Sequence, residues 1–493
     1  MLSERKMKII KKYRSLPLAL KASVWFFLCT FIQKGISVIT TPIFTRLMTT
    51  EEYGVFSIYG SWSDILSIFI TFGLSSSVYQ KKIVQLDQEA ERDRFTSSIQ
   101  GLATLTAALS LICYLIFHKW INRFIGLSTD LVLTIYLSIL LSTAFGFWSM
   151  RQRVEYKYKR LVSLTLITFS ARPLLGIIGI KLFPEHKVYA RIITILIVEV
   201  IAFTWIFIKQ FVDGKHFFDK KYWKYAIVFV IPLIPHFLSQ RILSQSDRVM
   251  INDYVGESAA GIYSLAHSIG WLMTIIITAL DYTIAPWTYQ KLHQKNTDRI
   301  KSFSVVPIVF MALGCFAFIT CAPEIILLFA PKEYREAMWL IPPLVVSTYF
   351  MMVYTMFIYI EYFHEKTKSI MVATISSAMM NIILNYIFIR AFGYQAAAYT
   401  SLVCYILYSL FHYFVFRKIC LEHYGCIVYD MKKILFVTVS FVVASFVMMS
   451  LYQFLIIRVF VIIVLFIIMI VKRREIQKVI AEIISAKKNN TAQ

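Results

Sequence analysis

Long apolar stretches, each near the length that spans a bilayer, recur along almost the whole chain. Only helices and closed barrels satisfy every backbone group inside a membrane, and a helix needs about 20 apolar residues to cross it. The 493 residues are 58% hydrophobic and 16% charged, unlike an ordinary soluble domain. We therefore predict an all-α, polytopic membrane protein with about 14 transmembrane helices, near residues 18–44, 55–79, 95–117, 131–150, 161–183, 188–211, 225–250, 259–289, 302–329, 338–362, 369–392, 395–416, 434–455 and 456–471.

The basic residues are distributed as expected for a multi-pass membrane protein. Fourteen helices place both termini on one side, and 37 of the 51 Lys and Arg fall on that side, against 11 in the opposite loops and three within apolar stretches. Because cytoplasmic loops carry the excess of Lys and Arg, we predict an inner (cytoplasmic) membrane protein with both termini cytoplasmic. Topology and anionic lipid then account for the net charge of +23, so no nucleic-acid partner is expected.

Residues typical of enzymes and metal sites are missing from the sequence pattern. The seven cysteines include no C-x-x-C pair, so we expect neither a disulfide framework nor a metal site, and no cofactor. No nucleophile–base pair or Gly-rich phosphate loop is evident. The pattern therefore indicates a transporter rather than an enzyme.

An internal repeat of about 200 residues indicates how the chain is divided. Six predicted helices separate the copies, and an even number returns the chain to the same side, so the repeats are parallel. We predict a basic cytoplasmic segment at 1–17, an N-lobe at 18–212, a C-lobe at 213–416, and two further helices with a basic tail at 417–493, with the lobes around a central cavity. At an offset of 207, the matching pairs are Gly54 and Gly261, Ser57 and Ser264, Ser61 and Ser268, Ser67 and Thr274, and Thr71 and Thr278.

Three cations lie inside apolar stretches of membrane-spanning length. They are Lys34, Arg172 and Arg241. A cation near the middle of a bilayer costs about 3 kcal/mol on insertion scales, so such a residue usually faces a partner or a water-filled cavity. A guanidinium offers a planar fork suited to phosphate oxygens and an ammonium offers a compact charge. The three cations therefore predict a binding site for an anion.

Three carboxylates also fall within apolar stretches, and two roles are open for them. Burial raises the proton affinity of a carboxyl group, so Asp64, Glu199 or Asp281 could carry the coupling ion, a proton or sodium, through the transport cycle. They could equally form salt bridges with the cations. Ser and Thr stripes on the same helices favour helix–helix packing when taken alone.

Three short stretches of the sequence form a recognisable pattern. They are Pro42, Thr45-Arg46 and Glu52-Tyr53-Gly54; Ser246-Asp247-Arg248 with Ala260-Gly261-Ile262-Tyr263; and Asn381, Leu384-Asn385, Gly393 and Ala396-Ala397-Ala398. Together they resemble the bacterial polysaccharide flippases, which belong to the multidrug/oligosaccharidyl-lipid/polysaccharide exporter superfamily. The resemblance extends over about residues 18–416.

The resemblance implies a carrier that moves an undecaprenyl-pyrophosphate-linked oligosaccharide to the outer leaflet by alternating access. On this hypothesis Lys34, Arg172 and Arg241 bind the pyrophosphate, while the lipid tail stays in the membrane lipid. Two further cations, Arg46 and Arg248, would act near the outer mouth, although at helix ends they could simply cap carbonyls. The predicted sugar contacts are Gln33, Gln240, Asn381 and Asn385, with Asn385 alternatively an interhelical contact.

Several other functions share parts of this pattern. A lipid II flippase has the same helix order, and the E-Y-G signature favours the polysaccharide branch instead. A drug/cation antiporter of the superfamily is expected to need acidic cavities rather than embedded cations. A membrane glycan polymerase or ligase usually carries a sizeable external loop, whereas the outer loops here are short. A polysaccharide polymerase and a chain-length regulator are left open as partners.

Overall fold

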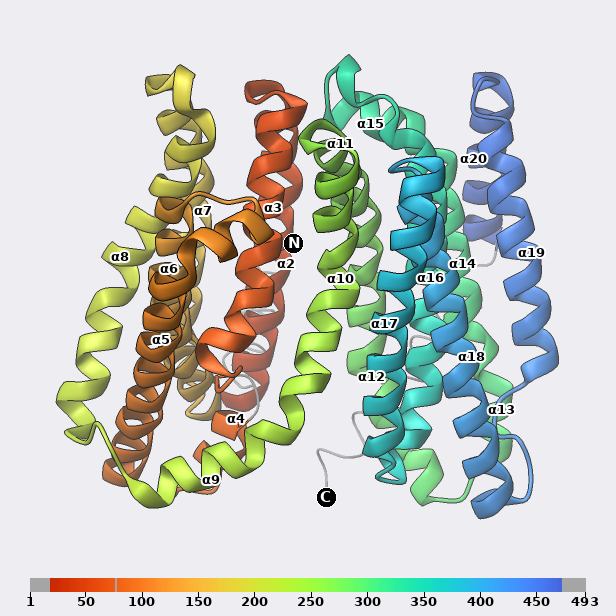
Figure 1. The fold of residues 1–493 in the computed structure, drawn as a ribbon. Helices are drawn as coiled ribbons and strands as arrows, with labels where there is room; N and C mark the ends of the chain where they lie inside the picture. The colour runs from red at the N-terminus through yellow and green to blue at the C-terminus, as the bar shows by residue number, and fades with distance from the viewer. Residues whose placement is uncertain (1–17, 76–77, 472–493) are drawn as a thin grey trace, which may run out of the picture. The chain divides into compact units, whose positions relative to one another are not determined.

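The first of two compact units comprises residues 1–241, and the computed structural model describes residues 18–75 and 78–471. Every regular element in the described ranges is helical, which confirms the predicted all-α class. In unit 1, long helices run side by side and a short one, α9, crosses one end of them (Figure 1). The elements of this unit are α2 (Leu18–Leu47), α3 (Thr50–Thr71), α4 (Val78–Ile83), α5 (Glu89–Ile125), α6 (Thr129–Val154), α7 (Tyr158–Leu182), η1 (Pro184–His186), α8 (Lys187–Gly214), α9 (Lys220–Val230), η2 (Ile231–Leu233) and the start of α10 (Ile234–Tyr254).

Unit 2 comprises residues 242–493 and contains the rest of α10. Its centre is α16, which is buried along most of its length and packs most closely on α18. The elements that follow α10 are α11 (Glu257–Gly270), η3 (Trp271–Met273), α12 (Thr274–His293), α13 (Thr297–Phe303), α14 (Val305–Thr320), α15 (Ala322–Phe329), η4 (Lys332–Tyr334), α16 (Ala337–Phe363), α17 (Thr367–Phe392), α18 (Ala396–Tyr424), α19 (Met431–Ser450) and α20 (Leu455–Val471).

The helices of the described ranges bear out a multi-pass membrane protein. Eleven candidate spans are long and apolar enough to cross a membrane. Helices also stand at the three other expected positions, α2, α3 and α20, but they are not among these eleven, so the count of 14 stays a prediction. Large apolar side chains on the flanks of both units are exposed, as with Ile201 in unit 1 and Phe436 in unit 2, each 73% exposed, which suits contact with lipid tails.

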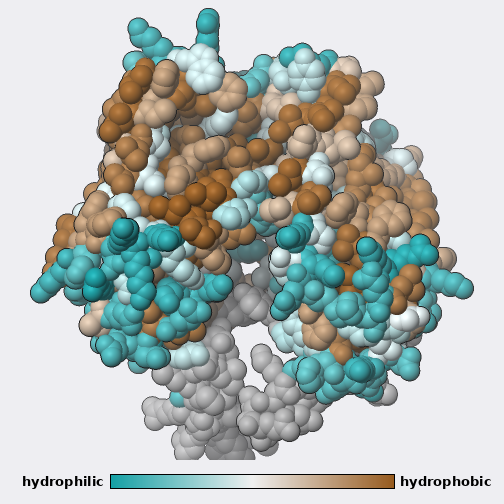
Figure 2. All heavy atoms as spheres, turned by 60° about the horizontal axis from the view of Figure 1, so that its bottom comes forward, coloured by the Kyte–Doolittle hydropathy of each residue, from teal (hydrophilic) through white to brown (hydrophobic). Residues whose placement is uncertain are grey.

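Hydrophilic residues gather at the helix ends rather than on the flanks. Figure 2 brings forward the end of unit 1 where α9 lies; within each unit, teal residues cover the near helix ends and brown residues cover the sides beyond them. In unit 1 this is the end predicted to be cytoplasmic.

Several predicted spans are interrupted, two of them at proline. Those at 55–79 and 259–289 are interrupted without one, since α3 ends at Thr71 and η3 separates α11 from α12. The predicted single helix at 302–329 is wrong, because α14 ends at Thr320 and α15 begins at Ala322, with Pro323 in its first turn. The span predicted at 225–250 is helical but bends through η2, where Pro232 and Pro235 each remove a backbone donor. The final break falls at residues 451–454, a few residues before the predicted one.

The signature residues at the start of α3 fix a helix end. Thr49 and Glu52 form a capping box, in which Thr49 Oγ1 accepts from the Glu52 backbone N–H at 3.2 Å and Glu52 Oε2 accepts from the Thr49 N–H at 2.8 Å. Glu52 also accepts from Lys187 Nζ on α8 at 3.2 Å. Next to this pair, Arg191 of α8 lies between the rings of Phe44 and Phe56, 3.7 and 3.6 Å from their centroids. The family signature therefore ties α2, α3 and α8 together.

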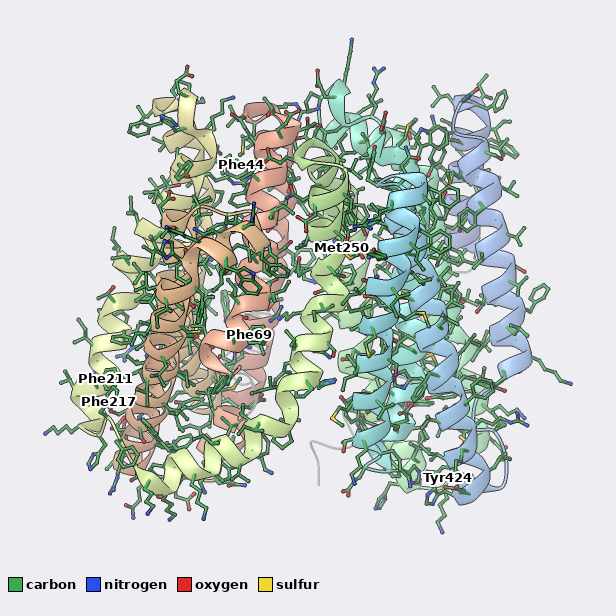
Figure 3. All side chains as sticks on the ribbon, viewed as in Figure 1. Phe44, Phe69, Phe211, Phe217, Met250 and Tyr424 are labelled. Atoms are coloured by element: carbon green, nitrogen blue, oxygen red, sulfur yellow. The ribbon has the colours of Figure 1, made fainter. Side chains whose placement is uncertain are left out.

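Helix α9 belongs to unit 1 because its apolar face packs on α5. Tyr222 of α9 meets Phe95 of α5 edge to face at 5.1 Å, and Phe95 stacks on Tyr79 of α4 at 5.6 Å. Beside them, Phe211 at the end of α8 stacks on Phe217 in the loop before α9 at 5.8 Å (Figure 3). The division between units consequently falls within α10, at residues 241 and 242, whereas the predicted lobes divide at 212 and 213.

Candidate functional site

An ion pair joins two helices inside unit 1. Arg172 on α7 and Glu199 on α8 lie 3.0 Å apart, and the Glu199 side chain is only 6% exposed. The guanidinium also lies over the rings of Phe169 and Phe203, at 5.1 and 5.8 Å from the centroids, and its Nε is buried without a hydrogen-bond partner. The structure thus brings together a predicted phosphate-binding cation and a predicted ion-coupling carboxylate, in the arrangement of the salt-bridge alternative.

A second pair, looser and more open, connects α10 with α3. Arg241 Nη1 lies 3.7 Å from Asp64 Oδ1, and both side chains are almost half exposed. At this distance and exposure the attraction between the two charges is screened by solvent. Both pairs consist of one predicted substrate-binding residue and one predicted coupling residue.

Lys34 differs from the two arginines. It is half-buried on α2, and within residues 18–75 and 78–471 it makes no hydrogen bond or ion pair. The adjacent Gln33 reaches Cys29 Sγ at 3.7 Å, and Gln240 on α10 is exposed. An unpaired ammonium within a predicted span is costly and is most readily explained by a wet surface or an anionic ligand.

The two arginines predicted at the outer mouth have local partners. Arg46 donates to the Pro42 carbonyl at 2.8 Å, one turn back on α2, as the capping alternative expects. Arg248 on α10 donates to Gln245 Oε1 at 2.6 Å and contacts His267 Nδ1 of α11 at 2.7 Å. A role in binding substrate stays a prediction for both.

Asp247 in unit 2 is the centre of a buried polar cluster that the site prediction did not include. The carboxylate is 3% exposed and accepts four hydrogen bonds from neutral groups of α11, α17 and α18. Four neutral donors on three helices therefore converge on this one carboxylate. The donors are Asn385 Nδ2 at 2.6 Å, Asn381 Nδ2 at 3.1 Å, Tyr263 Oη at 2.5 Å and Ser401 Oγ at 2.5 Å.

The two predicted sugar-binding asparagines are occupied by this cluster. Asn381 and Asn385 are 0% exposed. The side-chain oxygen of Asn381 accepts from Ser246 Oγ at 2.6 Å and that of Asn385 accepts from Thr400. This arrangement is that of an interhelical contact, the alternative weighed for Asn385 from sequence. In the sequence, the cluster could have been suspected from three polar residues that lie within predicted spans: Asp247, Asn381 and Asn385.

Two other carboxylates of unit 2 are also bound by neighbouring side chains. Asp281 on α12 is exposed and accepts from Tyr359 Oη of α16 at 2.7 Å. Glu361 on α16 is fully buried, 2.6 Å from His412 Nδ1 of α18, and accepts from Ser369 Oγ at 3.0 Å. In the part of the chain that the structure describes, no group of three or more His, Cys, Asp or Glu could hold a metal ion.

Comparison with known proteins places this architecture. A family model described as polysaccharide biosynthesis protein matches residues 19–291, more than half of the chain, and the MatE model matches residues 232–387. The fold and these matches define a multi-pass membrane transporter of the multidrug/oligosaccharidyl-lipid/polysaccharide exporter superfamily, not an enzyme. Within that class, the chain belongs to the polysaccharide biosynthesis protein family, which confirms the resemblance seen in the sequence.

Individual relatives extend over most of the chain. An uncharacterized membrane protein of Haemophilus influenzae is 24% identical over 362 residues, covering 70% of this chain and 84% of the relative. The probable low-salt glycan biosynthesis flippase Agl15 of Haloferax volcanii is 22% identical over 406 residues, covering 80% and 82%. The solved structure of the lipid II flippase MurJ in an inward closed conformation has a TM-score of 0.69 at 17% identity, covering 92% of this chain and 100% of that one.

Proposed function

We propose that this transporter moves undecaprenyl-pyrophosphate-linked oligosaccharides from the cytoplasmic to the outer leaflet of the inner membrane, with both of its termini in the cytoplasm. The product would serve synthesis of O-antigen, capsule or exopolysaccharide. Membership of the polysaccharide biosynthesis protein family supports a glycan substrate, and one relative carries the name of a glycan biosynthesis flippase. A pyrophosphate bearing sugars cannot cross hydrocarbon unaided, because each unsatisfied polar group costs several kcal/mol there.

The observation that carries the proposal is the set of three cations within the helices of unit 1. Lys34 has no partner among the described residues, whereas Arg172 and Arg241 face Glu199 and Asp64. A pyrophosphate could replace the carboxylate as the counter-ion of each arginine, since guanidinium binds phosphate oxygens in a bidentate manner. Lys34 could bind the pyrophosphate without first releasing a carboxylate.

The same pairs suggest how an ion could drive the cycle. Protonation of Asp64 removes its attraction for Arg241 and leaves the guanidinium available to phosphate; loss of the proton restores the pair and favours release. Protonation of Glu199 would free Arg172 for phosphate in the same way, in a pair whose side chains are less exposed to solvent. The exchange is consistent with alternating access coupled to protons, and sodium in place of the proton is the alternative.

The test is export by single variants in cells that depend on this protein for surface polysaccharide. Lys34→Ala and Arg241→Ala should each reduce export at least 10-fold, because each removes a phosphate partner, while the amount of protein in the membrane stays normal. Lys119→Ala, which removes an exposed lysine of α5 outside the proposed site, is the charge-matched control. Export at the wild-type rate by both variants contradicts the proposal.

A lipid II flippase is the second candidate, and the MurJ-like fold is the observation that favours it. Both substrates present a lipid-linked pyrophosphate, so the cations do not separate the two. Complementation does: a lipid II flippase restores growth of cells depleted of their own, whereas the proposed protein restores only surface polysaccharide. The MatE match allows a drug/cation antiporter, but three embedded cations disfavour a cationic substrate.

A further inference from the structure

The outward face of α9, the helix that crosses one end of unit 1 (Figure 1), changes from cationic to apolar along its length. Tyr222, Ala226 and Val230 lie four residues apart and form the buried face, which packs on α4 and α5. On the other side the first turn exposes lysines, whereas the last turn and η2 expose large apolar side chains, with Val228 at 66%. The exposed residues are Lys220, Lys221, Lys224, Ile227, Val228 and Ile231.

The loop before α9 adds another lysine and two exposed aromatic rings. Lys215 follows the end of α8 and is exposed, and Phe217 and Phe218 are 49% and 58% exposed. The Phe218 ring meets Trp223 of α9 edge to face at 4.8 Å. A segment that combines lysines with exposed phenylalanine and aliphatic side chains is typical of a helix lying in the interface between membrane and water.

Unit 1 holds this loop and helix in a fixed position. A Cβ on Gly101 of α5 would lie 2.0 Å from the Phe217 carbonyl oxygen, so the close approach of the loop requires glycine there. Trp223 Nε1 donates to the Ser98 carbonyl of α5 at 2.8 Å. The lysines are therefore presented by a backbone that is already ordered, which lowers the entropy cost of binding a ligand.

The lysines of this segment have no acidic partner among the described residues. The two acids closest to them in the sequence are engaged elsewhere. Asp213 pairs with Lys209 at 2.9 Å, and Asp219 lies 2.7 Å from Arg94 of α5. These carboxylates leave the charge of the lysines available to an external anion. The ammonium groups that form no ion pair or hydrogen bond with a described residue are those of Lys215, Lys220, Lys221 and Lys224.

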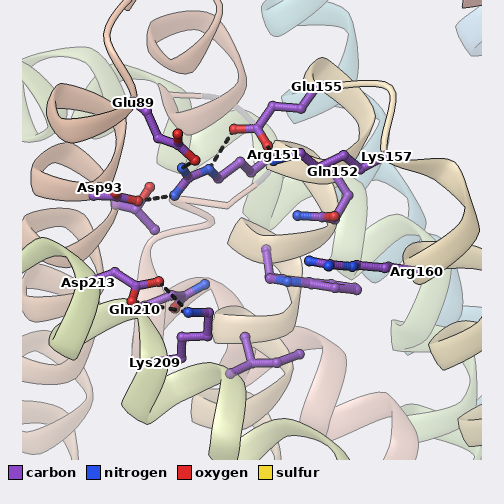
Figure 4. Close-up of a pocket in the computed structure, with 13 residues that line it drawn as sticks. Glu89, Asp93, Arg151, Gln152, Glu155, Lys157, Arg160, Lys209, Gln210 and Asp213 are labelled. Carbon is purple, nitrogen blue, oxygen red and sulfur yellow. Dashed lines mark hydrogen bonds and ion pairs between the residues drawn. The ribbon is translucent and has the colours of Figure 1, made fainter. Parts of the chain in front are cut away.

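Other charged residues at the same end of unit 1 compensate one another. A pocket of about 360 Å³ lies where α5 begins and α6 and α8 end, and its walls carry charges of both signs (Figure 4). Within it Arg151 binds Asp93 and also donates through Nε to Glu155 at 2.7 Å. Because these acids already have a counter-ion, they do not compensate the lysines of α9.

The continuation of α9 into the membrane favours a lipid over a soluble acidic partner. The candidate span Lys220–Tyr254 begins with α9, so its exposed apolar end lies in a stretch long and apolar enough to cross a membrane. A phospholipid offers a phosphate to the lysines and acyl chains to the apolar residues, in the same order along the helix. Clusters of about four to eight basic residues next to a membrane span are typical of binding to anionic lipid. A soluble acidic protein would match only the cationic part.

We propose that residues 215–231 form a binding surface for anionic phospholipids of the cytoplasmic leaflet, the α9 surface. Its four lysines bind lipid phosphates, and the exposed apolar side chains of its last turn lie among the acyl chains. The inference does not depend on which substrate the protein moves, so its failure leaves the proposed function untouched.

The test measures the melting temperature of purified full-length protein in a neutral detergent. The protein is titrated with phosphatidylglycerol or with phosphatidylcholine of the same acyl chains. A ligand that binds only the folded state raises the melting temperature, so phosphatidylglycerol should stabilise the wild type more than phosphatidylcholine does. The difference should shrink when NaCl is raised from about 50 to about 500 mM, because salt screens the charges. Equal stabilisation by the two lipids overturns the proposal.

A triple alanine variant assigns the effect to α9. It should bind phosphatidylglycerol at least about 10-fold more weakly, because each lysine near an anionic surface contributes about five-fold in affinity. Its melting temperature without lipid should equal that of the wild type, since the lysines are exposed and unpaired, so lost binding cannot be ascribed to misfolding. Arginine at the same three positions keeps the charge and should keep the binding. The variant combines Lys220→Ala, Lys221→Ala and Lys224→Ala.

The matched control removes three exposed lysines from separate segments of unit 2. It should bind phosphatidylglycerol as the wild type does, because these lysines do not form a cluster. Unchanged affinity in the α9 variant, or an equal loss in the control, overturns the assignment to the α9 surface. The control combines Lys295→Ala, Lys301→Ala and Lys366→Ala.

A soluble polyanion separates a lipid from an acidic protein as the partner. Polyglutamate presents carboxylates without acyl chains, so it should raise the melting temperature of the wild type less than phosphatidylglycerol does at the same concentration of negative charge. If polyglutamate stabilises the wild type as strongly as phosphatidylglycerol, and this effect also requires the lysines of α9, the surface binds an acidic protein and the lipid assignment fails.

Discussion

The pairs around Arg172 and Arg241 in unit 1 differ from the cluster around Asp247 in unit 2 in how a carboxylate is held. In unit 1 the carboxylates face guanidinium groups, as in the pairs of Arg172 with Glu199 and Arg241 with Asp64. In unit 2 Asp247 is held by amide and hydroxyl donors, with no ion pair to it among the described residues. Neutral donors can stabilise a carboxylate as well as a cation does, but they leave no positive charge for a ligand. The difference teaches that, on the proposed function, the cations proposed to bind phosphate belong to unit 1, while the polar cluster around Asp247 in unit 2 joins helices.

The largest effect is expected where this comparison depends on a true ion pair. Arg172→Met should destabilise the protein by about 4 kcal/mol, because it leaves Glu199 buried without its counter-ion. Adding Glu199→Gln should recover most of that loss, since the buried charge is then gone. Thermal unfolding of the two single variants and the double variant gives the coupling energy. Additive losses would show that the pair contributes nothing as a pair.

The corresponding test in unit 2 removes the central acceptor. Asp247→Ala should cost about 3 kcal/mol, because four donors on three helices lose their partner in a setting without water. Asp281→Ala is the matched control, since that carboxylate is exposed and the structure shows a single donor to it, Tyr359. Its melting temperature should stay within a few degrees of wild type. Equal losses of stability in Asp247→Ala and Asp281→Ala would show that the four buried hydrogen bonds of Asp247 do not stabilise the protein more than the single one of Asp281.

The sequence predicted the helical class and the intramembrane residues, but not which of them meet. Apolar length identifies spans, so most expected helices are found, but it does not show where a helix is interrupted, as at Pro323 and at the left-handed Phe72. Pairing depends on the rotation of each helix about its axis, which periodicity does not fix across units of this size. The contact of Arg172 with Glu199, 27 positions later, and that of Asp247 with Asn385 follow from packing that only the structure shows.

A smaller effect is expected from glycines that let backbones touch in unit 1. A Cβ on Gly214 would lie 2.2 Å from the Asp93 carbonyl oxygen, so Gly214→Ala should force α8 and α5 apart and cost about 2 kcal/mol. In unit 2 a Cβ on Gly270 would lie 3.3 Å from Leu344 Cβ, a contact that a small shift relieves. Gly60→Ala on α3 meets nothing within 4 Å and should be neutral or slightly stabilising. The melting temperature should be lowest for Gly214→Ala, higher for Gly270→Ala and highest for Gly60→Ala. A loss of stability in Gly60→Ala as large as that in Gly214→Ala would contradict the reasoning.

The smallest effect concerns Asp219, which holds the start of α9 against α5 in unit 1. Its Oδ1 accepts from the Lys221 and Tyr222 backbone N–H groups at 3.0 and 3.3 Å, and Oδ2 lies 2.7 Å from Arg94 of α5. Burial raises the pKa of the Asp219 carboxyl, but the backbone donors and Arg94 outweigh it and hold the pKa below its usual value. Asp219→Ala should cost about 1 kcal/mol, and Asp219→Asn less, because the amide oxygen still caps the helix.

The pH dependence of this contribution has a definite sign. Because the pKa of Asp219 is lower in the folded protein than in the unfolded chain, its stabilisation is complete above the unfolded value of about 3.9 and disappears as the pH falls through the lower, folded value. The difference in melting temperature between wild type and Asp219→Asn should therefore be constant from pH 7 to about pH 5 and shrink in more acidic buffer. A difference that instead grows as the pH is lowered would show that the carboxyl is destabilised by its surroundings, and the attachment of α9 to unit 1 would then have to depend on Tyr222 and its aromatic contacts alone.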